Sequence, residues 1–109
     1  MEAMNCYTKA LHHTTAPTGS IAAVLYSNRA LCEIHLEKFE LAREDAEDAI
    51  ENDPSQVKFY RTLSLALERL NLVEESLAVC ENGLKLDARD PDLLQRSRDC
   101  SAIIQQKVT

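Results

Sequence analysis

Apolar side chains recur at a helical spacing along most of this 109-residue chain. Near the start, Ala3, Tyr7 and Leu11 follow one another every four residues, and Ala10 lies on the same stripe of a helix. The same spacing predicts further helices at about 21–36, 39–51, 56–70, 73–86 and 91–106, the last of them fraying after Ile104. The pattern therefore indicates an all-α protein.

Helix-breaking residues separate these segments. The stretch HHTTAPTGS, with one proline and one glycine, predicts a loop at 14–20 in which Ser20 caps the following helix. Pro54 ends the helix before it, because the residue preceding a proline avoids the α-helical region. Pro91 suits the first position of the last helix, with Asp90 as its N-cap.

Residues that stand 34 positions apart resemble each other over much of the chain. The pairs are Tyr26 and Tyr60, Leu31 and Leu65, Leu36 and Leu70, Glu40 and Glu74, Ile50 and Leu84, and Asp53 and Asp87. A fixed period of this length is typical of helical hairpins that stack as repeats and bury their apolar faces against their neighbours. We therefore expect antiparallel helix-turn-helix repeats that lie side by side.

The composition fits one small helical domain and narrows its function. Apolar residues make up 45% of the chain, which has only two glycines and three prolines, so long helices are favoured over a sheet with many turns. No apolar run approaches the roughly 18 to 20 residues that span a bilayer, and the start lacks the features of a secretion signal. We expect a soluble, cytoplasmic protein. The net charge of −6 argues against nucleic-acid binding.

Residue types that support catalysis or metal binding occur without a matching pattern. The four cysteines are Cys6, Cys32, Cys80 and Cys100, with no CxxC pair. We expect them to be reduced and buried rather than bound to zinc or joined in disulfides. Cys32 and His35 could touch on one helix face, yet no acid or oxyanion site accompanies them, and the chain has no glycine-rich phosphate loop. We therefore expect neither an enzyme nor a metal or cofactor.

Small residues in these helices resemble the pattern of the tetratricopeptide repeat family, whose unit is two antiparallel helices. The matching sets are Tyr26 with Ala30; Tyr60 with Ser64; Ala3 with Tyr7 and Ala10; Ala42 with Ala46 and Ala49; and Ser76 with Cys80 and Gly83. Pro54 stands where the family's closing proline belongs, whereas the next repeat has Ala88 there. The resemblance covers nearly the whole chain and implies a short right-handed α-solenoid.

The family pattern implies a particular division of this single domain. It gives a half repeat at 1–13, a loop at 14–20, repeats at 21–54 and 55–88, and a capping helix at 91–106. The half repeat lacks its partner helix, so a stripe that includes Met4 should be partly uncovered. This arrangement suits a fragment, a shortened isoform or an end that pairs with another copy, and the sequence does not choose among them.

The first helices of successive repeats should form a concave inner surface. One presents Ser27, Asn28, Leu31 and His35, and the next presents Lys58, Arg61, Thr62, Leu65 and Arg69. Acidic residues crowd the helix at 39–51, namely Glu40, Glu44, Asp45, Glu47, Asp48 and Glu51. This division predicts a basic groove on an acidic body, which would favour an acidic peptide or a free carboxylate. Alternatively, the basic side chains are a solvated helix face that pairs with nearby acids.

The stretch LYSNRA at 25–30 resembles the members of the family that bind the acidic C-terminal tails of heat-shock chaperones through a carboxylate clamp. The resemblance implies that Asn28 and Lys58 occupy two of the clamp positions. Thr62 stands where an arginine is usual, and Arg61 lies about 100° around the helix from it. Two further clamp positions would belong to the absent first helix, so a complete clamp cannot be built from these residues.

Two functions follow as expectations. The first is an adaptor of the co-chaperone type that binds an extended acidic peptide, such as a chaperone tail, in its groove. The candidate peptide-binding residues are Asn28, Lys58, Arg61, Ser27, Leu31, Thr62, Leu65 and Arg69. The second is a structural module that forms a homodimer, or binds another helical protein, through its N-terminal helix.

Overall fold

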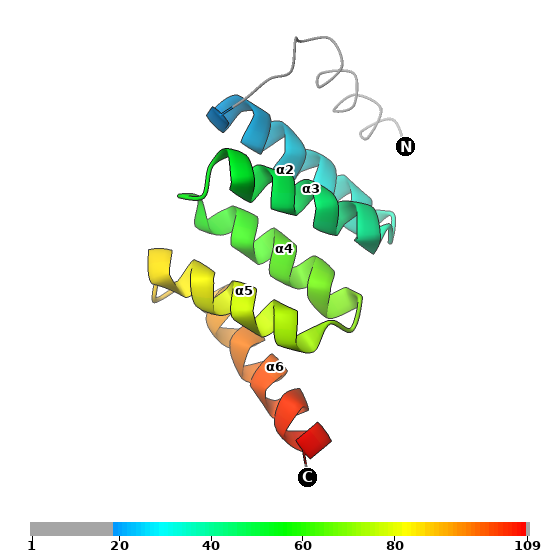
Figure 1. Cartoon of the computed structure of the whole chain (residues 1–109), viewed down its shortest axis with the longest axis vertical. Helices are drawn as coiled ribbons and strands as arrows, with labels where there is room; N and C mark the ends of the chain where they lie inside the picture. Colours follow the sequence, from blue (N-terminus) through cyan, green and yellow to red (C-terminus); the bar gives the residue numbers. More distant parts are fainter. Residues whose placement is uncertain (1–18, 109) are drawn as a thin grey trace.

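The structure is a computed structural model that describes residues 19–108. The helices in this range are α2 (Gly19–His35), α3 (Phe39–Asn52), α4 (Val57–Arg69), α5 (Val73–Leu86) and α6 (Pro91–Val108). No strand occurs among these residues, and each helix lies beside the next in a single stack (Figure 1). The predicted all-α fold of stacked helical hairpins is confirmed. The half repeat at 1–13 and most of the predicted loop lie outside the described residues.

The start of α2 differs from the prediction. The helix begins at Gly19, so Ser20 lies within it rather than in a loop that caps it. Two partners from the end of α3 hold this end, since the Gly19 N–H donates to Oδ1 of Asn52 at 3.3 Å and the Ser20 hydroxyl donates to Oδ2 of Asp53 at 3.3 Å. These tertiary contacts replace the expected local cap. At the other end of the chain, α6 continues to Val108 rather than fraying after residue 104.

The turns within the two hairpins have the same backbone geometry. Glu37 and Asn71, which are 34 residues apart, have positive φ angles of 60° and 64°. After each of them a backbone N–H donates a hydrogen bond to a carbonyl of the preceding helix. Lys38 donates to Glu33 at 2.7 Å, and Leu72 donates to Leu67 at 2.9 Å. A left-handed residue followed by such a bond is a common way to end a helix. The 34-residue period thus extends from side chains to the backbone.

Small residues allow the helices to approach closely. One core cluster contains Ala30, Ala42, Ala46, Leu63, Ala66 and Leu67, and a second contains Ala23, Ala49 and Phe59. The closest approach is at Gly83, where an added Cβ would lie 2.6 Å from Cδ1 of Leu93 and 2.9 Å from Cβ of Tyr60. Because protein interiors are densely packed, the residues at these crossings must stay small.

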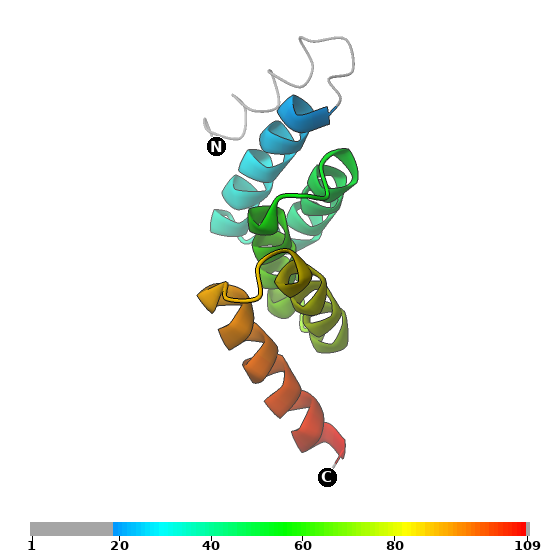
Figure 2. The same ribbon diagram turned by 90° about the vertical axis from the view of Figure 1, so that its left-hand side faces the viewer.

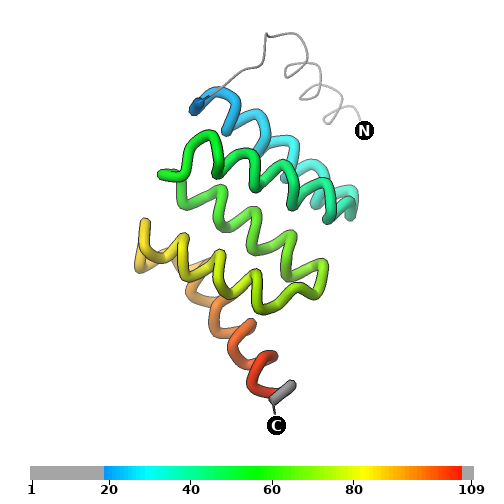
Figure 3. The backbone as a smooth tube through the Cα atoms, in the orientation of Figure 1, coloured from blue at the N-terminus to red at the C-terminus, as the bar shows by residue number. Residues whose placement is uncertain are grey.

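The backbone trace follows one continuous stack (Figure 3). The helices α2 and α4 are the first helices of the two hairpins, α6 follows at the equivalent place in the stack, and α4 contacts both α2 and α6. Seen from the side, α6 runs past α5 toward the C-terminus (Figure 2). Within the described residues, no helix is both long and apolar enough to cross a membrane.

Candidate functional site

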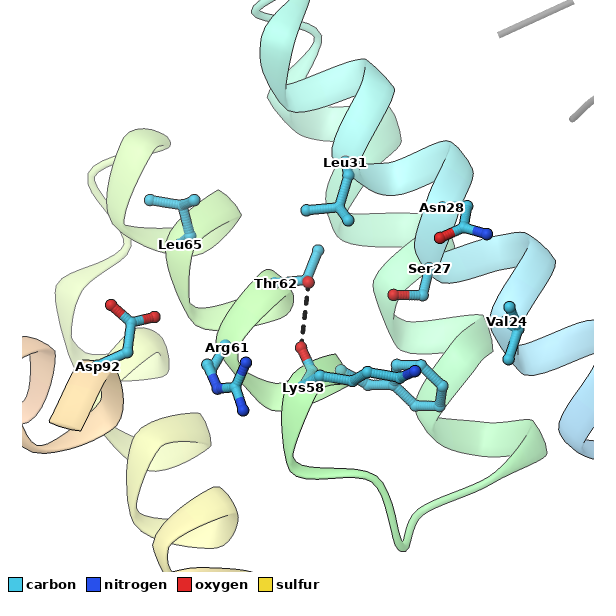
Figure 4. Close-up of a pocket in the computed structure, with 10 residues that line it drawn as sticks. Val24, Ser27, Asn28, Leu31, Lys58, Arg61, Thr62, Leu65 and Asp92 are labelled. Carbon is cyan, nitrogen blue, oxygen red and sulfur yellow. Dashed lines mark hydrogen bonds between the residues drawn. The ribbon is translucent and has the colours of Figure 1, made fainter. Parts of the chain in front are cut away.

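A cavity of about 370 Å³ opens between the first helices of the stack. It is lined by Val24, Ser27, Asn28 and Leu31 from α2, by Lys58, Phe59, Arg61, Thr62 and Leu65 from α4, and by Asp92 from α6 (Figure 4). The lining combines apolar side chains with a few polar and charged groups. This composition is common in sites that bind small molecules or peptides.

Seven of the eight candidate peptide-binding residues line this one cavity. They are Ser27, Asn28, Leu31, Lys58, Arg61, Thr62 and Leu65. The eighth, Arg69, is the last residue of α4 and lies outside the cavity, because eleven residues of helix place it about 16 Å beyond Lys58. The repeat period and the helical spacing therefore identified residues of two helices that lie at one cavity. The role of these residues in peptide binding stays a prediction.

Asn28 and Lys58 are available to a ligand in different ways. Asn28 is half-buried, and its side-chain amide forms no hydrogen bond with another described residue. Lys58 makes no ion pair within the described part of the chain, and its Nζ lies 5.7 Å from the centroid of the Phe59 ring. In Figure 4 the Lys58 side chain extends from α4 toward Val24 and Ser27 on α2. An amide and an ammonium group thus face the same cavity, and neither has a hydrogen-bond or ion-pair partner among these residues.

Arg61 already has a partner. Its Nε donates to Oδ2 of Asp90 at 2.8 Å, and the Asp90 side chain is only 4% exposed. Oδ1 of Asp90 also accepts the backbone N–H of Leu93 at 3.0 Å, which confirms Asp90 as the N-cap of α6. Burial by itself would raise the pKa of Asp90, but the bonds from Leu93 and Arg61 hold this pKa below its ordinary value. Of the two alternatives for Arg61, the structure therefore favours a side chain that pairs with a nearby acid over one that is a free cation in a basic groove.

Thr62 does not supply a free donor to the cavity. It is buried, and its hydroxyl donates to the carbonyl of Lys58 on its own helix at 3.1 Å. The structure therefore gives no substitute at this position for the arginine that the family pattern expects.

Three lining residues were not among the candidates: Val24, Phe59 and Asp92. Two of them follow from the period, because Val24 and Asp92 stand 34 residues before and after Lys58. Phe59 is fully buried and belongs to the core beneath the cavity. Applying the repeat offset to Lys58 would have found both Val24 and Asp92.

A buried ionic cluster holds α2 against α3, away from the cavity. Arg29 donates to both carboxylate oxygens of Asp45, each bond being 2.7 Å long. Glu33 lies next to this pair and is 3% exposed. Burial, together with the neighbouring Asp45, raises the pKa of Glu33 to about 8, so Glu33 is mostly protonated at neutral pH. The cluster fixes the helix that presents Asn28.

The remaining candidates for chemistry that the structure describes form no metal site. Cys80 and Cys100 are buried as expected, whereas Cys32 is only half-buried, and burial raises the pKa of the Cys80 thiol. Among the residues that the structure describes, no group of histidine, cysteine and acidic side chains could hold a metal ion. Cys6 lies outside that range.

Comparisons with known proteins agree with this fold. No family model matches the chain. The first TPR of Spaghetti (RPAP3), solved bound to the HSP90 peptide SRMEEVD, is 29% identical to this chain. The match covers 95% of this chain and 79% of that one, and the two superpose with a TM-score of 0.86. The Hsp90 co-chaperone Cns1 from Saccharomyces cerevisiae is 28% identical, with 96% of this chain and 34% of its own covered and a TM-score of 0.87.

One curated sequence matches nearly the whole chain. Protein unc-45 homolog B from Danio rerio is 28% identical over 107 residues, which are 98% of this chain and 12% of that protein. The chain thus spans about an eighth of the length of that relative. The fold is that of a tetratricopeptide repeat domain, and the predicted resemblance to the repeat domains of co-chaperones is confirmed.

Proposed function

We propose that this tetratricopeptide repeat chain of the co-chaperone type is an adaptor that binds an extended peptide through its free C-terminal carboxylate. The observation that supports this most is the placement of the Asn28 amide and the Lys58 ammonium in one cavity, where neither has a hydrogen-bond or ion-pair partner among the described residues. Both groups donate hydrogen bonds, and a carboxylate offers oxygen atoms that accept them. A heat-shock chaperone tail is the partner that we favour.

The cavity also provides apolar surface for a peptide side chain. Leu31 is 43% exposed and Val24 is 41% exposed, and both line the cavity opposite α4. Burying such surface adds to the affinity, since apolar burial contributes about 25 cal/mol per Å². This contribution is important here, because Thr62 and Arg61 have other partners and each missing ionic hydrogen bond forfeits about 1.5 to 3 kcal/mol.

The relatives support the proposed partner. The Spaghetti domain is described as bound to the HSP90 peptide SRMEEVD, which ends in an acidic residue. By binding a tail of this kind, the chain would connect a chaperone to the protein that this chain is joined or bound to. The chain itself would carry out no chemical step. We place this activity in the cytoplasm. The alternative, assembly through the N-terminal helix, stays a prediction, since that helix lies outside the described residues.

Calorimetric titration of the peptide SRMEEVD into matched variants tests the proposal. Asn28→Ala and Lys58→Ala should each weaken binding by about tenfold or more, because each removes a hydrogen bond to a charged group. Asn82→Ala and Lys85→Ala on α5 are the controls, since both residues are exposed and outside the cavity. Equal affinities for all four variants and the unsubstituted chain would contradict the proposal.

A further inference from the structure

One repeat position carries a different charge on each of α2, α4 and α6. Val24 on α2, Lys58 on α4 and Asp92 on α6 are separated by 34 residues each, and all three line the cavity. Because the hairpins stack with the same period, equivalent positions face the same concave surface. The cavity wall therefore passes from an apolar residue to a cation and then to an anion.

Asp92 keeps its carboxylate accessible. It lies in the first turn of α6, and its side chain is 53% exposed. Oδ2 accepts a hydrogen bond from Nη1 of Arg96 at 3.2 Å, while Oδ1 has no hydrogen-bond partner among the described side chains. In Figure 4, Arg61 stands between Asp92 and Lys58. A ligand that reaches across the cavity from Lys58 and past Arg61 would meet this carboxylate.

The neighbouring cations do not cancel the negative charge at this end. The Nε of Arg61 is bonded to Asp90 rather than to Asp92. Arg96 divides its guanidinium between Asp92 and Glu68, from which its Nε lies 3.7 Å away. Among the described residues, these two guanidinium groups are thus shared by the carboxylates of Asp90, Asp92 and Glu68, of which only Asp92 lines the cavity. The α6 end of the cavity therefore carries an exposed carboxylate, in contrast to the basic groove expected from the sequence.

We propose that Asp92 makes the groove selective for the charge of a peptide side chain upstream of the terminal carboxylate. The carboxylate would bind at Asn28 and Lys58, and the side chain that reaches α6 would be basic or neutral, because an acidic one would face Asp92. This inference rests on the proposed function and gives its ligand a charge pattern: a non-acidic position upstream of an acidic C-terminal end.

The experiment compares the peptide SRMEEVD with three variants that each reverse one upstream charge, namely SEMEEVD, SRMKEVD and SRMEKVD. Each is titrated at low ionic strength into the unsubstituted chain, Asp92→Asn and Asp92→Lys. At one of these positions the unsubstituted chain should favour the basic over the acidic side chain by about two- to fivefold, the range of exposed ion pairs. Asp92→Asn should remove this preference, and Asp92→Lys should reverse it.

Asp99→Asn is the matched control. Asp99 also lies on α6, is exposed and accepts a hydrogen bond from a side chain four residues away, that of Gln95 at 3.0 Å. It does not line the cavity, so its substitution should leave the charge preference unchanged. A preference that persists in Asp92→Asn, or that Asp99→Asn removes equally, would overturn the inference.

The amidated peptide separates this inference from the proposed function. If the unsubstituted chain binds the free acid more tightly than the amide but shows no charge preference that depends on residue 92, the proposed function stands and the role of Asp92 is wrong. If the free acid and the amide bind equally, the proposed function fails and this inference fails with it. Circular dichroism of each variant checks that the helices are intact.

Discussion

The Nε of Arg61 lies 2.8 Å from Oδ2 of Asp90, and this bond joins the cavity wall on α4 to the beginning of α6. The same carboxylate caps α6 through the backbone N–H of Leu93. One buried side chain therefore does two things: it starts the last helix and holds the cation that separates Lys58 from Asp92. The end of the stack and the proposed groove are coupled through Asp90.

Replacing Asp90 by alanine should destabilise the fold. The substitution removes a helix cap and leaves Arg61 without its partner, so we expect the free energy of unfolding to fall by about 1 to 3 kcal/mol. Urea denaturation followed by circular dichroism measures the change. Asp99→Ala removes an exposed acid from the same helix and should cost less than about 0.5 kcal/mol. Equal losses in the two variants would contradict the coupling role of Asp90.

Acidification should weaken the same contact. The pKa of Asp90 is below its ordinary value of 3.8 in the folded chain, so its carboxylate stabilises the fold above that value. This stabilisation should be lost as the pH falls below about 4 and the carboxylate becomes protonated. Unfolding free energies measured between pH 6 and pH 3 should therefore fall less steeply in Asp90→Asn than in the unsubstituted chain. Parallel curves would rule out this contribution.

Glu33 should produce the opposite dependence at higher pH. Its pKa is about 8 in the folded chain against an ordinary 4.5, so between these values the folded chain holds a proton that the unfolded chain has released. The free energy of unfolding should then decrease as the pH rises through this window. From pH 5 to pH 8 the free energy of unfolding should fall less in Glu33→Gln than in the unsubstituted chain, by on the order of 1 to 3 kcal/mol. The exposed Glu47→Gln on the same helix as Asp45 serves as the comparison and should keep the slope of the unsubstituted chain.

Gly83 should not tolerate a side chain. Alanine normally favours a helix over glycine by about 1 kcal/mol, but here its Cβ would overlap Leu93 and Tyr60. Because overpacking costs about 1 to 3 kcal/mol, Gly83→Ala should lower the midpoint of thermal unfolding. The neighbouring, exposed Asn82→Ala gains the same kind of helix propensity without the clash and should leave the midpoint unchanged or raise it. A stabilised Gly83→Ala variant would show that α5 does not pack as closely as described.

The sequence predicted the fold well because the ends of its helices are set largely by residues close to them in the chain. Pro54 and Pro91 end or begin helices through their own backbone geometry, and the structure has α3 ending at Asn52 and α6 beginning at Pro91. The start of α2 was placed too late because its stabilising partners, Asn52 and Asp53, lie more than thirty residues away. No local pattern reveals such contacts.

The candidate site was partly predictable for the same reason. Helical spacing and the 34-residue period placed Asn28 and Lys58 on one surface, and the same period applied once more identifies Asp92. The bond between Arg61 and Asp90 spans 29 residues, which matches neither a helix turn nor the repeat. Predicting the charge of the groove therefore required the three-dimensional packing of α6.

The most direct test of this account is the affinity of the unsubstituted chain for SRMEEVD as the free acid and as the C-terminal amide, measured by calorimetry under the same salt conditions. The amide should bind at least about tenfold more weakly, since it lacks the charge that Lys58 and Asn28 would hold. Equal affinity of the two peptides, or no binding of either, would contradict it.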